Sequence, residues 1–322
     1  MSDVKAILIP LDGSDLAECA LAAGSSIARR LNAFIHLVRV HTQLPLFEVG
    51  AEIVTLTPES EREITEQEEQ YLEGVATQLR AEGLAVSTTV VKGSIVPALH
   101  SYTEHHGIGL VVMSSHGRGG IRRAVLGSVA DQLVRSVSIP VLIVTPAMAP
   151  RIDDQWPRRV LVPLDGSELG DSAIDAVREL DPRRTAQLLL ATILQTSFPP
   201  MSPWAYQPDL YPEAVEHNQE RLRMHLNNVA DGLRADGFRV AARILNGGKV
   251  AREILKLGIA RQCDMIVMAT HGAGGLDRVM FGSVADQVIR HSNMPILVVR
   301  PMLNEPTQAD NRREPAFVEA GA

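Results

Sequence analysis

The chain has 322 residues with a formal net charge of −7, and 45% of its residues are hydrophobic, which is typical of a globular protein long enough for two domains. No basic block accompanies this charge, so we expect neither nucleic acid nor an anionic membrane surface as a partner. No apolar run approaches the roughly 20 residues of a membrane helix, and the first residues lead into a strand instead of a signal peptide, so we expect a cytoplasmic protein.

A tandem repeat organises the sequence. Residues 4–10 are predicted to form a buried strand ending in Pro10, followed by a Leu-Asp-Gly-Ser turn that contains Asp12 and opens a helix reaching about residue 31. The same Leu-Asp-Gly-Ser sequence returns after Pro163 with Asp165 in the turn. The two aspartates are 165 − 12 = 153 residues apart. The chain therefore consists of two similar halves.

Matched elements follow in both halves. The predicted pairs are second strands at 33–40 and 186–194, Pro-containing loops at 41–57 and 195–210, charged helices at 58–80 and 211–234, third strands at 84–91 and 238–245, helices ending near 104 and 261, fourth strands at 110–113 and 265–268, and closing strands at 139–144 and 294–299. The glutamates of the first charged helix, Glu68 among them, are interpreted as a solvated face. Five mostly apolar strands alternating with four helices predict a parallel sheet covered on both faces in each half.

The predicted domains are residues 1–146 and 158–301, with a linker at 147–157 and a polar, disordered tail at 302–322. Duplication predicts that the two domains pair as an internal dimer through their edge strands, and it leaves a further homodimer open. Cys19 and Cys263 have no disulfide or metal spacing and are expected to be small core residues. No metal site is assigned.

A glycine-rich stretch follows the fourth strand in each half, and it ends in Gly127-Ser128 and in Gly282-Ser283. Glycines allow backbone N–H groups to turn toward an anion, and the amides at a helix start favour phosphate. The alternative is that the glycines only shape a turn and the serine only caps a helix. Equal spacing in two copies favours the anion site, although duplication also copies structural features.

The spacing of these stretches resembles the nucleotide motif of the universal stress protein family, Gly-x-x-Gly-x9-Gly-(Ser/Thr). Gly117 and Gly127-Ser128 fit it in the first half, as do Gly272 and Gly282-Ser283 in the second. Ser114 and Ala269 replace the leading glycine. If that position needs a positive φ, the replacement costs about 1–2 kcal/mol; if it needs only a close approach to the ligand, a small residue suffices.

The resemblance covers almost the whole chain and implies two doubly wound, five-stranded, Rossmann-like domains of the adenine nucleotide alpha hydrolase-like kind, with strand order 3-2-1-4-5. It implies ATP as the ligand and leaves open whether Mg or Mn accompanies it. The expected nucleotide-binding residues are Pro10, Asp12, Val40, Ser114, His116, Gly117, Arg118, Gly120, Gly127, Ser128 and Val129, and Pro163, Asp165, Ile193, Ala269, His271, Gly272, Gly275, Gly282, Ser283 and Val284.

In an open parallel sheet the ligand binds beyond the carboxyl ends of the strands, where the winding reverses. If the first and fourth strands are neighbours, Asp12 and the glycine-rich stretch share one crevice. Because a carboxylate repels phosphate, we expect Asp12 to meet a ribose hydroxyl or a base edge. Arg118, Arg122 and Arg123 surround the first stretch, and we expect the first site to bind a triphosphate more tightly.

The resemblance implies a nucleotide-binding stress-response protein that acts as a sensor or regulator. Its protein partners are not identified by the sequence. No catalytic residue is assigned, because His116 and His271 lack an evident nucleophile or orienting group. Two alternatives stay open. One is a slow, metal-dependent ATPase, and the other is a nucleotide-free protein-interaction module.

Overall fold

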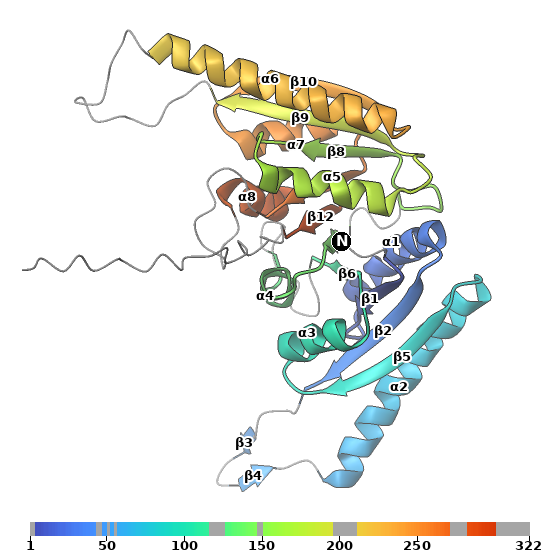
Figure 1. The fold of residues 1–322 in the computed structure, drawn as a ribbon. Helices are drawn as coiled ribbons and strands as arrows, with labels where there is room; N and C mark the ends of the chain where they lie inside the picture. Colours follow the sequence, from blue (N-terminus) through green and yellow to red (C-terminus); the bar gives the residue numbers. More distant parts are fainter. Residues whose placement is uncertain are drawn as a thin grey trace, which may run out of the picture.

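A computed structural model describes residues 4–42, 47–49, 52–54, 57–115, 126–146, 151–195, 211–270 and 282–300 (Figure 1). The first half contains β1 (Ala6–Pro10), α1 (Asp15–Leu31), β2 (Phe34–His41), β3 (Phe47–Val49), β4 (Glu52–Val54), α2 (Pro58–Ala81), β5 (Val86–Lys92), α3 (Ile95–His105), β6 (Leu110–Ser114), α4 (Ser128–Ser136) and β7 (Val141–Val144). The second half contains β8 (Arg159–Pro163), α5 (Glu168–Leu180), β9 (Gln187–Gln195), α6 (Tyr211–Ala235), β10 (Arg239–Gly247), α7 (Val250–Ala260), β11 (Met265–Ala269), α8 (Ser283–His291) and β12 (Ile296–Val299).

The strands form one ten-stranded sheet in the order β10-β9-β8-β11-β12-β7-β6-β1-β2-β5. In this sheet the strand pairs within each half are all parallel and the order is 3-2-1-4-5, as predicted. The closing strands β7 and β12 pair antiparallel, with Leu142 opposite Leu297. The predicted internal dimer through edge strands is therefore confirmed, and each edge protects the other from pairing with foreign strands.

Helices cover both faces of this sheet because its strands carry apolar side chains on both sides. Ile7 and Ile9 of β1 face one core together with residues of α1, α2, α5 and α6. Leu8 faces the other core, to which α3, α4, α7 and α8 contribute. The alternation along a single strand thus sends successive side chains into two cores, and equivalent helices of the two halves lie on the same face.

Side chains at the helix starts explain where α1 and α5 begin. Ser14 and Ser167 are N-caps, and their hydroxyl oxygens accept hydrogen bonds from the amides of Ala17 and Gly170, which satisfies donors that the helix leaves open. One prediction was incomplete, because the segment expected to be a loop contains the short antiparallel pair β3 and β4.

The two halves also meet outside the sheet. The aspartates of the repeated Gly-Ser-Val-Ala-Asp-Gln sequence lie on α4 and α8, where Asp131 accepts from Arg290 at 3.3 Å and Asp286 lies 3.9 Å from Arg135. Each aspartate also pairs with the arginine of its own helix at 2.9 Å. A symmetric network of four charges therefore joins α4 to α8.

Residues 151–157, in the segment expected to link the domains, pack between them. Trp156 is 1% exposed, its indole N–H donates to the carbonyl of Asp264, and its own carbonyl accepts from the hydroxyl of Ser26 on α1. The domain boundaries themselves stay a prediction.

Candidate functional site

The strands that the sequence placed beside one crevice are neighbours in both halves. β1 pairs with β6, with Leu8 opposite Val111, and β8 pairs with β11 in the equivalent register. The chain winds outward from this point in both directions, so each half has its switch point between its first and fourth strands. Pro10 and Ser114 end the two strands at the same edge of the first half, and Pro163 and Ala269 do so in the second.

The aspartate after the first strand organises the turn into the next helix. Asp12 Oδ1 accepts hydrogen bonds from the backbone N–H and the hydroxyl of Ser14, at 3.0 and 2.6 Å, and Asp165 holds Ser167 at the same two distances. Space is tight there, since a Cβ on Gly170 would lie 2.7 Å from Asp165 Oδ1. One carboxylate oxygen of each aspartate thus has a structural role in this turn.

A helix start occupies the other side of the switch point. α4 and α8 begin at Ser128 and Ser283, whose side chains are exposed, and the N-caps are Gly127 and Gly282. A glycine N-cap offers no side-chain acceptor, so the amides of the first helical turn have no side-chain cap among the described residues. The serines are the first helical residues and not the caps, which removes the interpretation that they serve only as N-caps.

The two N-cap glycines connect the helix start to the fourth strand. The N–H of Gly127 donates to the carbonyl of Ser115, and the N–H of Gly282 donates to that of Thr270, each at 2.8 Å. A Cβ on Gly282 would lie 3.2 Å from that carbonyl, which accounts for glycine at this position by close packing. These two N–H groups are therefore taken by the protein, and the first amides that can face an anion are those of Ser128 and Ser283.

The replaced leading glycine carries no backbone strain. Ser114 and Ala269 are the last residues of β6 and β11, where they pair with Val144 and Val299. Neither is among the residues with positive φ, which in the described part of the chain are Asn32, Arg184 and Gln262 apart from glycines. The strain of about 1–2 kcal/mol that a left-handed position would impose on Ser114 or Ala269 is thus absent, and only the close-approach role remains for that position.

The second strand extends past the first at this edge. Pro10 pairs with Val38, so Val40 lies two residues beyond the end of β1, and Ile193 lies two residues beyond Ala191, the partner of Pro163. This position places backbone groups of Val40 and Ile193 at the mouth of the crevice. The side chains of both residues pack against the core on the α3 and α7 side.

Several expected site residues lie outside the described residues: His116, Gly117, Arg118, Gly120, His271, Gly272 and Gly275. Arg122 and Arg123 also lie there. The expectation that the arginines strengthen the first site stays a prediction.

The sequence did not reveal a charged cluster beside the first crevice. Glu68 of α2 lies 2.9 Å from Arg39 and 2.8 Å from His41, both at the end of β2, and its side chain is only 11% exposed. The interpretation of Glu68 as part of a solvated face was therefore wrong. Neighbouring Tyr71 donates to Glu18 at 2.8 Å, and burial followed by this hydrogen bond raises the pKa of the tyrosine.

The second half replaces this cluster with mostly uncharged residues. The strand register makes Thr192 and Leu194 equivalent to Arg39 and His41, and the matching buried positions of α2 and α6 make Leu222 equivalent to Glu68. His225, equivalent to Tyr71, contacts Asp171 at 3.0 Å. The two crevices thus share a backbone frame but differ in charge.

Comparison with known proteins agrees with this geometry. The model of the universal stress protein family matches residues 3–145 and 157–300. The chain belongs to the universal stress protein family. A universal stress protein of Mycobacterium tuberculosis is 26% identical over 308 residues, covering 91% of this chain and 96% of that protein, and one of Mycolicibacterium smegmatis is 27% identical over 304 residues, covering 92% and 97%.

Solved structures of the family share the fold over the same length. A universal stress protein of Archaeoglobus fulgidus has a TM-score of 0.65 at 21% identity, covering 92% of this chain and 96% of that one. The two chains thus share their fold over almost their whole length. Among the described residues, no helix has the length and apolar character to cross a membrane.

Proposed function

We propose that this universal stress protein binds an adenine nucleotide, ATP, in each of its two crevices and acts as a stress-response sensor or regulator. One observation carries the proposal: in both halves an aspartate turn and a glycine-capped helix start lie on the two sides of the switch point. A doubly wound sheet offers its ligand site at this position, and the positive end of a short helix favours phosphate there.

Different residues contact the phosphates and the nucleoside of the ligand. The amides and hydroxyl at Ser128 hold the phosphates, while Asp12 and the backbone at Val40 meet the nucleoside; Ser283, Asp165 and Ile193 do the same in the second half. Hydrogen bonds to charged groups contribute about 1.5–3 kcal/mol each, so a few of them support micromolar affinity, about −8.2 kcal/mol, after the costs of association.

A route from ligand to regulation runs through α4. This helix has nine residues, and its start faces the phosphate while Asp131 and Arg135 further along it pair with α8 of the other half. A shift of α4 on ATP binding would change the contact between the domains. We propose that this coupling presents a different surface to protein partners with and without nucleotide.

A charge placed at the helix start tests the site. Ser128→Asp and Ser283→Asp put a carboxylate beside the amides that we assign to phosphate. We expect ATP affinity, measured by calorimetric titration of the full chain, to fall at least about tenfold, equivalent to about 1.4 kcal/mol. The free protein should gain about 0.3–1 kcal/mol of stability per site, because a negative charge suits a helix start.

Ser136→Ala and Ser128→Ala serve as controls for these variants, the first at the other end of α4 and the second without added charge. Ser136→Ala should leave ATP binding unchanged. For the wild type, ATP at 100 times its Kd should add about 2.7 kcal/mol of stability. Absence of both heat and thermal shift would support the nucleotide-free interaction module instead, and phosphate release that Ser128→Asp abolishes would support the slow ATPase. A cytoplasmic location and a further homodimer stay predictions.

A further inference from the structure

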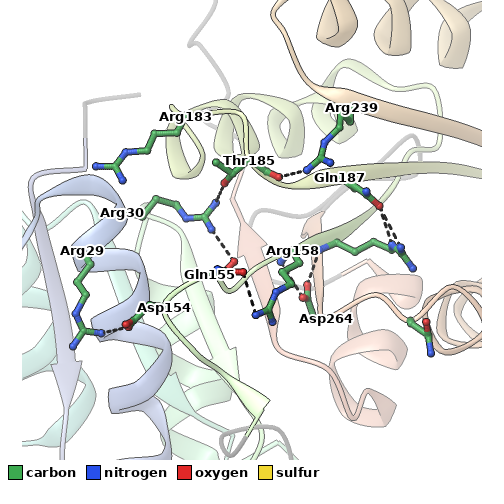
Figure 2. A pocket seen from close by; sticks show the side chains of 12 residues that line it. Arg29, Arg30, Asp154, Gln155, Arg158, Arg183, Thr185, Gln187, Arg239 and Asp264 are labelled. Carbon is green, nitrogen blue, oxygen red and sulfur yellow. Dashed lines mark hydrogen bonds and ion pairs between the residues drawn. The ribbon is translucent and has the colours of Figure 1, made fainter.

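A cavity of about 690 Å³ lies at the junction of the two domains, apart from the two crevices (Figure 2). Its walls come from the end of α1 in the first domain and from the segment before β8, the beginnings of β8, β9 and β10, and the turns that precede β9 and β11. It is therefore at the opposite end of the second domain's strands from Asp165 and Ser283. Its volume is in the range of small-molecule sites, about 300–1,000 Å³.

The lining of this cavity is unusual for a chain of net negative charge. Of its twelve residues, six are arginines and two are aspartates, and none is apolar. Most ligand sites have predominantly apolar walls, so this cavity does not suit an aromatic base or a hydrocarbon. A charged, strongly hydrated ligand fits it better.

Three of the arginines lie in or beside one row of paired residues across the sheet, which we call a rung. Arg159 and Arg239 belong to this rung, and Arg183 lies beside it. Arg159, Gln187 and Arg239 are the first residues of β8, β9 and β10 and lie in register, so their side chains leave the same face of adjacent strands. Two strand spacings of about 4.8 Å put the outer two about 10 Å apart. Arg183, from the turn between α5 and β9, faces the same cavity (Figure 2).

Within the described part of the chain, Arg159 and Arg239 meet only neutral acceptors. Arg159 donates to the amide oxygen of Gln187 at 3.3 and 3.2 Å and to the carbonyl of Arg261, and Arg239 donates to the carbonyl of Thr185 at 2.6 Å. Arg183 is exposed and has no hydrogen-bond or ion-pair partner in the described part of the chain. Asp264 adds one carboxylate to the lining; it accepts from the backbone N–H groups of Arg158 and Arg159 at 2.9 and 3.0 Å and has no ion pair with these three arginines among the described residues.

The fold itself does not require this charge. The equivalent rung of the first domain consists of Ala6, Phe34 and Ala85, which the register places opposite one another. The same sheet therefore forms with apolar residues at these positions. Arginines that the fold does not need, gathered from distant parts of the sequence around one cavity, indicate a binding role.

We propose that this cavity is a second ligand site, separate from the nucleotide crevices, for a small anion that carries two or more phosphate groups. Guanidinium groups bind phosphate through paired N–H donors. The three guanidinium groups and the carboxylate of Asp264 sum to 3 − 1 = +2, and paired donors on residues spread over about 10 Å can contact more than one phosphate group. Because α1 of the first domain also lines the cavity, the bound anion holds the two domains together.

Inorganic tripolyphosphate is the probe, because it has no base and cannot use the nucleoside part of a crevice. The experiment is calorimetric titration of the full chain carrying Ser128→Asp and Ser283→Asp, in which we expect the crevice phosphate sites to be weakened. We expect tripolyphosphate to bind this protein. Adding Arg183→Gln and Arg239→Gln should weaken tripolyphosphate binding at least tenfold.

The matched control replaces Arg243, four residues further along β10, and Arg252 on α7, both exposed and outside the cavity. Arg243→Gln with Arg252→Gln makes the same change in net charge and should alter affinity less than twofold. Equal losses in the two double variants, or no binding of tripolyphosphate before they are made, would overturn the proposal. A protein whose crevices do not bind ATP could still bind tripolyphosphate in this cavity. The proposed function and this proposal can therefore be refuted independently.

Discussion

Arg30 and Asp181 form an ion pair of 2.9 Å whose side chains are only 7% and 5% exposed. Arg30 lies in the last turn of α1 of the first domain and Asp181 directly follows α5 of the second, so the pair joins the two domains on the face that α1 and α5 cover. Further groups complete it. Arg30 also donates to Thr185, and Asp181 accepts from the N–H of Ala186 at 2.8 Å.

Removing one partner should destabilise the protein strongly. Asp181→Ala leaves the guanidinium of Arg30 buried without its counter-charge, which typically costs about 3–5 kcal/mol. Asp154→Ala is the matched control, because Asp154 pairs with the adjacent Arg29 but is 75% exposed, and an exposed pair contributes about 0–1 kcal/mol. Scanning calorimetry of both variants checks this, and equal melting temperatures would show that the buried pair does not stabilise the junction.

Local patterns were enough to predict the frame of the crevice. Apolar runs fixed the strands, the repeated Leu-Asp-Gly-Ser phrase marked the start of α1 and α5, and the family resemblance supplied the strand order. The structure confirms that β1 and β6 are neighbours, the condition on which the crevice depends. Interactions between residues close in the sequence, such as Asp12 with Ser14, follow from such patterns.

Features that depend on register were not predictable. Glu68 reads as one of several glutamates on a charged helix, and only the packing of α2 on β2 shows that it faces Arg39. The arginine rung has the same origin, since Arg159 and Arg239 become neighbours of one cavity only through strand pairing. Trp156, in a segment with prolines, gave no signal that it fills a gap between domains.

Stability should depend on pH through His36. Burial, and then the nearby His106, lower the pKa of His36 below its ordinary value of 6.5, so just below pH 6.5 the unfolded chain binds more protons than the folded one. Stability should therefore rise as pH increases up to 6.5. Melting temperatures of His36→Asn should show a flatter slope in this interval, whereas the exposed His217→Asn should keep the wild-type slope. A wild-type slope in His36→Asn would contradict this assignment.

Both cysteines should resist thiol reagents in the folded protein. Burial raises the pKa of Cys19 and Cys263 from 9.0 to about 11, so the reactive thiolate is about a hundredfold rarer at pH 8. Labelling by a maleimide or an aromatic disulfide should be slow in buffer and rapid in denaturant. Fast labelling of the native chain, located by mass spectrometry, would show that a cysteine is accessible.

The cluster around Glu68 allows a test of what buried charges cost. The equivalent, mostly uncharged positions of the second half serve as the reference. Glu68→Leu alone copies Leu222 of the second half but leaves Arg39, 13% exposed, without its carboxylate, and we expect a loss of up to about 3–5 kcal/mol. The triple variant that adds Arg39→Thr and His41→Leu copies the second half at all three positions. It should be more stable than Glu68→Leu, because no uncompensated charge remains and apolar packing replaces the ion pairs. Calorimetry of both variants measures the difference, and a triple variant less stable than the single one would mean that Arg39 and His41 stabilise the first crevice independently of Glu68.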